Sequence, residues 1–507
     1  MPTMVSAPPS GLEEQLKTTP GTYVEGWLNC TTGSADLILC QDGQEDRVLL
    51  DSAQDLHSFR FVATGHALTL TIRKDAATQA ELRITKVVTP EDQGTGTTGQ
   101  ECAAPISPRL QKVVQGHVSV ATFWQDVMSV GTPMIEPDPE GCADHRLVTF
   151  LWRGKARNVR LVGGPAPDHV WMQRLTGTDV WFASFRVPLD LRLSYRLAPD
   201  VPDINASPRE NRLALLAVAQ ADPMNRTPLF PHVNDPFAQW SLHDLRGQTR
   251  AAKQVLGRVS RDVTEHRIAD PMLKSGRRIW LHRPTGFIPG APGNVLQILF
   301  DGATYLHQLG LPCRIEQQVQ DGCLPPIATV FVDAVSPHRR AEDLGCDDQF
   351  TQMLTGKILP FAYDWFGQDF DASRVVVAGS SFGGLAAAYT ALVRPKQIGN
   401  FISLSGSFWW APPGWEAISP YMASLPVDPG LRAVLTAGSY ERARHEGDVG
   451  ILESTAALAA RLRAQGAGVQ TRTYAGGHDY AIWAPALIEA LETLFGPGAR
   501  NNRRTGG

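Results

Sequence analysis

The chain has few cysteines, and they are irregularly spaced. Only seven of its 507 residues are cysteine, and none of them forms a C-x-x-C pair. This excludes a disulfide scaffold and gives no sign of a zinc site. Only Cys30 and Cys40, which both fall in a predicted all-β region, suggest a disulfide.

Long hydrophobic runs are also missing. The longest, such as residues 213–219 and 375–378, are far shorter than the ~20 residues that a membrane-spanning helix needs. Residues 1–21 contain prolines and a lysine but no apolar stretch typical of a signal peptide. We therefore expect a soluble globular chain without a membrane span and with a cytoplasmic address. The alternative is the periplasm, if a signal peptide has been removed.

Neither sign of charge dominates. The chain has 47 Lys and Arg against 51 Asp and Glu, a formal net charge of −4, so we do not expect it to bind nucleic acid. No cluster of residues has metal-ligand spacing, so we expect neither a metal site nor a cofactor. Apolar residues make up 43% of the chain, which is ample for packed cores. At ~150 residues a domain, the length suggests about three domains.

The first two predicted domains are rich in β-strands. Residues 1–92 alternate apolar and polar positions in short runs, which predicts a β-sandwich-like domain of unknown role. Residues 93–104, which include the Gly- and Thr-rich stretch 94–99, are predicted to be a flexible linker. Residues 105–252 form the second domain, with strands expected at 146–152, 158–161, 180–187 and 192–197.

After residue 253 the pattern changes to strands that alternate with helices. This predicts an α/β domain over 253–497, with a mostly parallel sheet and helices on both faces. Residues 498–507 are predicted to be a disordered tail. The expected strands are 278–282, 294–300, 327–332, 374–378, 401–404, 433–437 and 469–474. The expected helices are 348–366, 384–393, 450–466 and 484–495.

A G-x-S-x-G motif provides a candidate nucleophile. Ser381 is its central serine, and the motif lies between the β-branched run 375–377 and an apolar helix start at 384–388. A strand, a tight turn and a helix are the context of the nucleophile elbow in α/β-hydrolases. We therefore predict that Ser381 is the nucleophile and that the N–H of Phe382 faces a developing oxyanion.

The α/β-hydrolase order requires the acid and the histidine to follow the serine in the chain. Only His445 and His478 follow Ser381, and His445 lies in a charged segment. We predict His478, which follows the last expected strand, as the general base.

The loop after strand 433–437 should carry the acid. It offers Glu441, Glu446 and Asp448. We favour Glu441 and keep Asp448 as the alternative; a Ser–His pair with only a weak orienting acid is a third arrangement. Gly302, after strand 294–300, is predicted to supply a second oxyanion N–H, although Asp301-Gly302 reads equally well as a plain turn.

Several motifs, taken in order, resemble the enterochelin esterase family, the siderophore trilactone hydrolases of esterase D type. The resemblance covers roughly residues 120–495. It rests on the segments 148–154, 193–200, 222–225, 300–302, 340–344, the elbow, 405–410 and 476–479. The first hundred residues have no counterpart in the usual family layout. Asp343 stands where the family pattern has Glu.

The resemblance implies a serine esterase that hydrolyses the ester bonds of catecholate trilactone siderophores such as enterobactin, free or ferric, for intracellular iron release. It implies no cofactor, because iron arrives only as part of the substrate. It also implies that Arg340 sits beside the substrate and that Trp409 and Trp410 wall the pocket. The alternatives are a general acyl esterase or peptidase of the same fold, and a non-catalytic siderophore-binding protein. The oligomeric state is not predicted.

Overall fold

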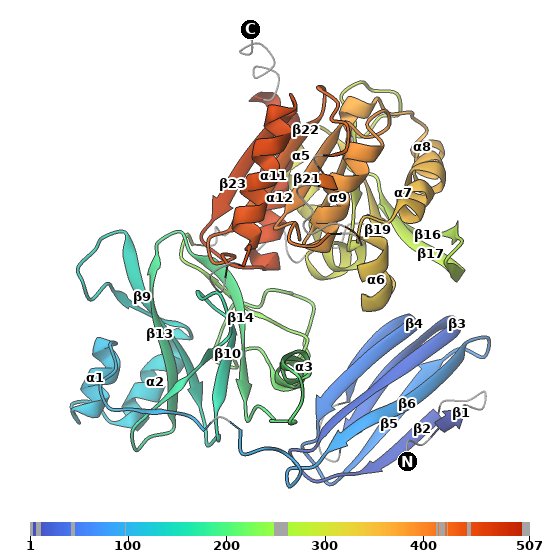
Figure 1. The fold of residues 1–507 in the computed structure, drawn as a ribbon. Coiled ribbons are helices and arrows are strands. Elements are labelled where there is room, and N and C mark those ends of the chain that lie inside the picture. The colour runs from blue at the N-terminus through green and yellow to red at the C-terminus, as the bar shows by residue number, and fades with distance from the viewer. Residues whose placement is uncertain are drawn as a thin grey trace. The chain divides into compact units, whose positions relative to one another are not determined.

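The structure is a computed structural model that forms two compact units, Met1–Arg246 and Gly247–Gly507. Figure 1 shows the order of their elements. The expected domain boundary at 252 and the predicted tail beyond residue 498 fall outside the described residues. Those described are 4–6, 12–41, 46–96, 98–247, 262–411, 414, 421–422, 424–443 and 448–498.

The N-terminal strands of the first unit form one six-stranded sheet. The long strand β3 pairs with β4, and it also pairs first with β6 and then with β5. A core that includes Leu28, Leu37, Phe61 and Ile72 lies inside this sheet. The strands are β1 (Met4–Ser6), β2 (Leu12–Lys17), β3 (Tyr23–Gln41), β4 (Arg47–Val62), β5 (Ala67–Lys74) and β6 (Gln79–Val88).

The suggested disulfide between Cys30 and Cys40 does not form, and both thiols are free. The reason is that both residues lie on β3 (Tyr23–Gln41). Ten positions along an extended strand separate two residues by roughly 30 Å, whereas a disulfide needs Cα atoms within about 7 Å.

The segment 93–104, predicted to be a flexible linker, is instead packed in the described residues. The N–H of Gly94 donates to the carbonyl of Asp203 at 2.9 Å, and that of Gly99 donates to Arg157 at 3.0 Å. A Cβ on Gly99 would lie within 2.1 Å of the Trp181 ring. The glycines of this segment therefore permit close approach to a neighbouring surface, which composition alone did not distinguish from flexibility.

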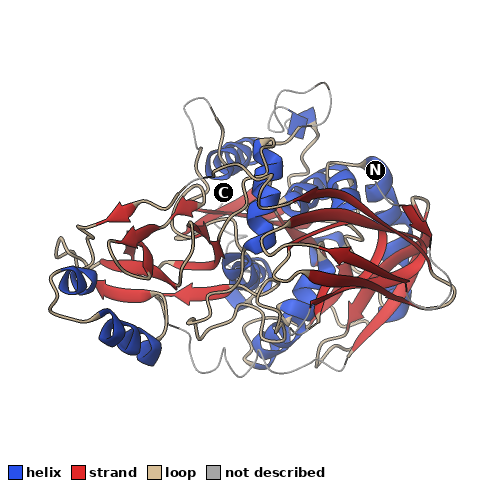
Figure 2. Ribbon diagram, turned by 90° about the horizontal axis from the view of Figure 1, so that it is seen from below, coloured by secondary structure: helices blue, strands red, loops and turns tan. Residues whose placement is uncertain are grey.

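The second part of the first unit has two sheets, in the strand orders β11-β10-β14-β15 and β7-β12-β13-β9-β8. Strands dominate this part, and only three helices accompany them in the described residues (Figure 2). The strands are β7 (Glu101–Cys102), β8 (Met134–Pro137), β9 (His145–Arg153), β10 (Val159–Gly163), β11 (Val170–Trp171), β12 (Gln173–Leu175), β13 (Val180–Pro188), β14 (Arg192–Pro199) and β15 (Ser241–Asp244). The helices are α1 (Pro108–Val114), α2 (Val120–Val130) and α3 (Pro208–Val218).

The two parts of this unit contact each other. Arg47 on β4 forms a 3.2 Å ion pair with Asp235 and lies over the Phe237 ring. Tyr23 packs with Ala214 and Ala217 of α3. These contacts explain why the N-terminal sheet and the part after it form one unit.

An eight-stranded sheet forms the centre of the second unit, in the order β16-β17-β19-β18-β20-β21-β22-β23. The pairs from β19 to β23 are parallel, whereas β16 and β17 are antiparallel. All seven predicted strands are present, and β16 was not predicted. The strands are β16 (Val263–Asp270), β17 (Leu273–His282), β18 (Val295–Leu299), β19 (Ile327–Val332), β20 (Val375–Ser380), β21 (Asn400–Leu404), β22 (Arg432–Gly438) and β23 (Gly468–Tyr474).

Helices cover both faces of this sheet, as its buried apolar strands require. Residues of α7, α8, α9 and α11 share one hydrophobic cluster, whereas α5 and α12 contact each other on the other face. Helices α5 and α6 were not predicted. The helices are α5 (Leu311–Gln320), α6 (Pro337–Asp343), α7 (Asp348–Met353), α8 (Leu359–Phe366), α9 (Phe382–Val393), α11 (Ile451–Ala464) and α12 (Tyr480–Phe495), with the short turns η1 (Thr304–Gln308), η2 (Leu354–Ile358) and η3 (Ala372–Arg374).

Two negative findings apply to the described residues. No helix among them has the length and apolar character to cross a membrane. No group of three or more His, Cys, Asp or Glu side chains among them is placed to hold a metal ion.

The buried His243 on β15 predicts a pH-dependent stability. Burial lowers the pKa of this imidazole from 6.5 to about 4, although Asp244 opposes the shift. Between these two values the unfolded chain binds a proton that the folded chain does not, so acid favours unfolding there. Lowering the pH from 7 to 5 should reduce the free energy of unfolding of the parent protein. We expect this reduction to be about 2 kcal/mol smaller in His243→Gln. Urea unfolding of the full chain at both pH values measures this difference, and equal losses would contradict it.

Candidate active site

Ser381 occupies a strained turn between β20 and α9. Its φ of 59° and ψ of −122° lie outside the regions that non-glycine residues favour, and such strain is concentrated at functional sites. The turn also needs its glycines, because a Cβ on Gly379 would lie 2.5 Å from the carbonyl carbon of Gly383. The structure therefore places Ser381 on a sharp strand-to-helix elbow.

An acid–base pair lies on the loops after β22 and β23. Nδ1 of His478 is 2.6 Å from Oε1 of Glu441. The other carboxylate oxygen, Oε2, accepts hydrogen bonds from the N–H of Gly438 at 2.5 Å and from the Ser405 hydroxyl at 2.6 Å. Only 8% of Glu441 is exposed, and its two carboxyl oxygens make these three hydrogen bonds.

The other candidate acids do not share this position. Asp448 is exposed, and among the described residues it makes no hydrogen bond to His478. His445 and Glu446 lie outside the described residues.

The Ser381 hydroxyl faces a second serine. Its Oγ lies 3.3 Å from Oγ of Ser407, and the N–H of Ser407 donates to the Ser381 carbonyl. The hydrogen bonds found among the described residues include none between Ser381 and His478. The structure thus forms the Glu441–His478 pair and directs the Ser381 hydroxyl to Ser407.

The Asp301-Gly302 turn lies beside the elbow. Oδ2 of Asp301 is 3.3 Å from the position that a Cβ on Gly383 would take. Asp301 has a φ of 54°, and its carbonyl accepts from the N–H of Thr304, so the segment is a turn that also adjoins the elbow. A Cβ on Gly302 would lie 2.6 Å from the backbone nitrogen of Val332, which explains the glycine.

Arg340 connects this turn with the elbow. Its Nε and Nη2 donate to the two oxygens of Asp301 at 2.5 and 2.7 Å, and Nη2 also donates to the carbonyl of Ser380. Burial alone would lower the pKa of Arg340, but the Asp301 carboxylate raises it above its ordinary value. Arg340 was predicted to sit beside the substrate. In the structure, two of its N–H groups are bonded to Asp301.

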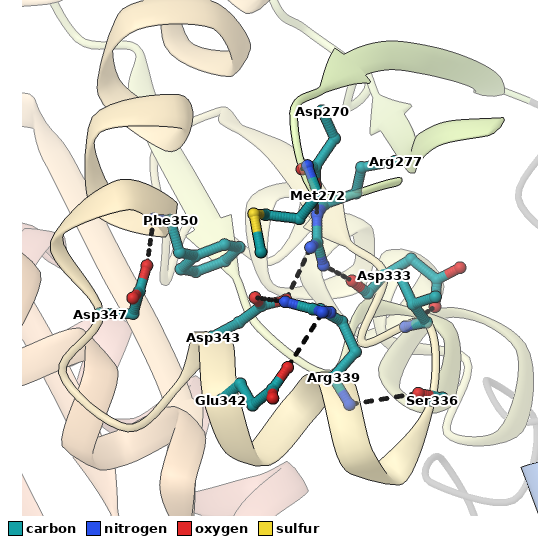
Figure 3. Close-up of polar contacts among 11 residues, drawn as sticks. Asp270, Met272, Arg277, Asp333, Ser336, Arg339, Glu342, Asp343, Asp347 and Phe350 are labelled. Atoms are coloured by element: carbon teal, nitrogen blue, oxygen red, sulfur yellow. Dashed lines mark hydrogen bonds and ion pairs between the residues drawn. The ribbon is translucent and has the colours of Figure 1, made fainter. Parts of the chain in front are cut away.

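A buried ion-pair network holds the helix that carries Arg340, as Figure 3 shows. Arg277 on β17 contacts Asp270 at 2.8 Å and Asp343 at 2.6 Å, and it donates to the carbonyl of Asp333. Arg339 on α6 lies 3.6 Å from the other oxygen of Asp343. Asp343, which stands where the family pattern has Glu, thus contacts both arginines. The sequence pattern did not single out Arg277.

The two tryptophans differ in exposure. The rings of Trp409 and Trp410 both pack edge-on against Phe382, at 5.9 and 6.3 Å between centroids. Trp409 is 51% exposed, whereas Trp410 packs partly buried against the core of the sheet. Only Trp409 therefore offers a broad exposed aromatic surface next to the elbow.

Sequence reasoning missed three residues of this region, Ser405, Ser407 and Trp483. The first two lie in the motif 405–410, which was noted without roles for its serines. The indole N–H of Trp483 donates to Oγ of Ser405 at 2.9 Å, and its ring packs edge-on against His478. Trp483 and Ser405 are 78 positions apart in sequence, so no sequence spacing could have linked them.

Comparison with known proteins agrees with this architecture. Residues 147–250 match the family model of the enterochelin esterase N-terminal domain, and residues 271–494 match that of a putative esterase. The iron(III) enterobactin esterase of Dickeya dadantii is 29% identical over 414 residues, covering 74% of this chain and 92% of that protein. The iron(III) salmochelin esterase of Escherichia coli O6:H1 is 28% identical over 436 residues, covering 78% and 99%.

A solved structure also matches. The crystal structure of the enterobactin esterase from Shigella flexneri in the presence of enterobactin has a TM-score of 0.61 and 26% identity, covering 75% of this chain and 99% of that one. The α/β fold and the esterase match define the class: the chain is a carboxylic ester hydrolase. These matches confirm the predicted resemblance to the enterochelin esterase family and the predicted fold class.

The Arg340–Asp301 pair predicts a stability effect. Only 5% of the Asp301 side chain is exposed, so Arg340→Met leaves a nearly buried carboxylate without its partner. We expect a loss of about 3 kcal/mol in the free energy of unfolding, measured with urea. Arg394→Met, which breaks the more exposed pair with Asp348, should cost less than about 1 kcal/mol. Equal losses of unfolding free energy in the two variants would contradict a stabilising role for the Arg340–Asp301 pair.

Proposed function

We propose that this protein is a serine esterase that hydrolyses the ester bonds of catecholate trilactone siderophores such as enterobactin, free or ferric. The observation that carries the proposal is the partly buried Glu441–His478 hydrogen bond at the same sheet edge as the strained Ser381 elbow. The names of the relatives support the substrate class. Iron is part of the substrate here, and intracellular release of that iron is the proposed purpose. The cytoplasmic location stays a prediction from the sequence.

In the proposed reaction Ser381 attacks an ester carbonyl of the substrate. His478 takes the serine proton at Nε2 while Glu441 holds Nδ1, and this requires the Ser381 hydroxyl to turn from Ser407 to the imidazole. The N–H groups of Phe382 and Gly302 stabilise the tetrahedral oxyanion. His478 then returns the proton to the leaving alcohol, and a water molecule, deprotonated by the same imidazole, releases the acid from Ser381.

The aromatic surface beside the elbow suits catechol rings. Trp409 is half exposed and rests on Phe382, the residue directly after the proposed nucleophile. A flat apolar ring there can stack a catechol while its ester lies over Ser381. Trp410 supports this wall from the partly buried side.

Removal of the nucleophile gives the first test. We expect Ser381→Ala to lower kcat by roughly 10⁵-fold or more while the folded state and siderophore binding stay, because only the attacking oxygen is lost. Product analysis by mass spectrometry and binding by fluorescence quenching measure the two effects. Undiminished hydrolysis by Ser381→Ala would refute the proposal, and so would binding without turnover by the parent protein.

The choice of acid gives the second test. Glu441→Gln should lower kcat on the order of 10³- to 10⁴-fold, because the amide no longer stabilises the imidazolium. Asp448→Asn is the matched control in the same loop and should leave kcat unchanged. Steady-state kinetics on ferric enterobactin decide between them, and the reverse order would assign the acid to Asp448.

The substrate class is tested by competition between esters. We expect kcat/KM for enterobactin and its glycosylated form to exceed that for p-nitrophenyl esters by orders of magnitude, because only the trilactones offer catechol rings to Trp409. A preference for the simple esters would leave a general acyl esterase.

A further inference from the structure

Ser405 lies at the end of β21, directly after Leu404, and its backbone is strained. Its φ is 49°, a left-handed value that strains the backbone of a non-glycine residue. The residue is completely buried. A buried serine in this conformation needs a reason beyond the turn, since glycine would make the turn without strain.

The hydrogen bonds of Ser405 have a fixed direction. Its Oγ lies 2.9 Å from Nε1 of Trp483 and 2.6 Å from Oε2 of Glu441. An indole nitrogen can only donate, so the serine oxygen accepts from Trp483. Its single hydrogen then points to Glu441, because no buried hydroxyl hydrogen should lack an acceptor.

This direction leaves one carboxylate oxygen of Glu441 for the histidine. Oε2 of Glu441 receives the Ser405 hydroxyl and the N–H of Gly438, which leaves Oε1 for His478. A carboxylic acid is a stronger acid than an imidazolium, so a hydrogen shared between two such side chains is carried by the imidazole. The hydrogen between Oε1 and Nδ1 therefore belongs to His478, and its Nε2 is the free acceptor for a proton.

The same tryptophan also restrains the base. The rings of Trp483 and His478 meet edge-on, with centroids 4.6 Å apart and planes at 89°. Trp483 is 5% exposed and lies in the first turn of α12, which begins two residues after His478. One side chain thus contacts the ring of the base and, through Ser405, the carboxylate of the acid.

We propose that Trp483 and Ser405 are positioning residues that fix the ionised form of Glu441 and the Nδ1–H tautomer of His478. The inference rests on the proposed function, because it assigns the base and acid roles to these two residues. Both positioning residues are buried. Their contribution is a one-way chain of hydrogen bonds that starts at the donor-only indole.

The test is Trp483→Phe, which keeps an aromatic ring against His478 and removes the donor. We expect kcat to fall ~10- to 100-fold with KM changed less than about twofold, since second-layer partners of catalytic groups act at this scale. The rate at which a fluorophosphonate labels Ser381 should fall in parallel. The downfield proton resonance of Nδ1–H should shift or broaden.

Trp280→Phe is the matched control. The indole N–H of Trp280 also donates to a carboxylate, Glu265 at 3.0 Å, and its ring also meets a histidine edge-on, His307 at 5.2 Å. This variant loses the same chemistry outside the site, and we expect kcat within about twofold of the parent. A kcat that is unchanged in Trp483→Phe, or reduced equally in both variants, would overturn the inference.

Ser405→Gly provides an independent variant if Trp483→Phe does not fold. Glycine suits the left-handed backbone, so the loop keeps its path while the hydroxyl is lost. We expect the same loss of kcat, and Ser405→Cys, which keeps a weak donor, should recover part of it. Loss of activity in Ser381→Ala together with full activity in both positioning variants would overturn this inference alone. Full activity in Ser381→Ala would overturn the proposed function itself.

Discussion

The parallel register of five neighbouring strands is the constraint on which the site depends. Strands β18 and β20 to β23 pair in parallel, so the loop after each one begins at the same edge of the sheet. These loops carry, in turn, the Asp301 turn, the Ser381 elbow, Ser405 and Ser407, Glu441, and His478. Residues nearly two hundred positions apart in sequence become neighbours because these parallel strands all end at this edge. Strands β18 and β20 to β22 are buried between the helices, and β23 closes the edge of the sheet.

Charge at this edge is compensated almost entirely within the protein. Arg340 and Asp301 neutralise each other between the elbow and the Asp301-Gly302 turn, and Arg277 is held between Asp270 and Asp343 beneath α6. Buried ion pairs contribute little net stability when desolvation is counted, but breaking one is costly. These ion pairs fix the positions of the loops and helices, because each pair joins two of them with directional bonds.

The first unit shows how composition can mislead. Glycines between residues 93 and 104 resemble a flexible spacer, yet Gly94 and Gly99 are bonded to a neighbouring surface that only a residue without a side chain can approach so closely. The N-terminal sheet precedes the first family match at residue 147. Its contacts through Arg47 and Tyr23 nonetheless make it part of the same compact unit.

Local sequence located the elements and selected the candidate site residues. Alternating and β-branched runs located seven strands of the second unit, and the order of serine, acid and histidine after strand ends singled out Ser381, Glu441 and His478. These signals are local, because strand periodicity and turn chemistry act between residues close in sequence. Only the tertiary structure decided that Arg340 pairs with Asp301, that Arg277 lies beneath α6, and that Trp483 reaches Ser405. Those contacts join side chains from separate strands and helices, and their partners are set by the packing of the sheet and not by any spacing along the chain.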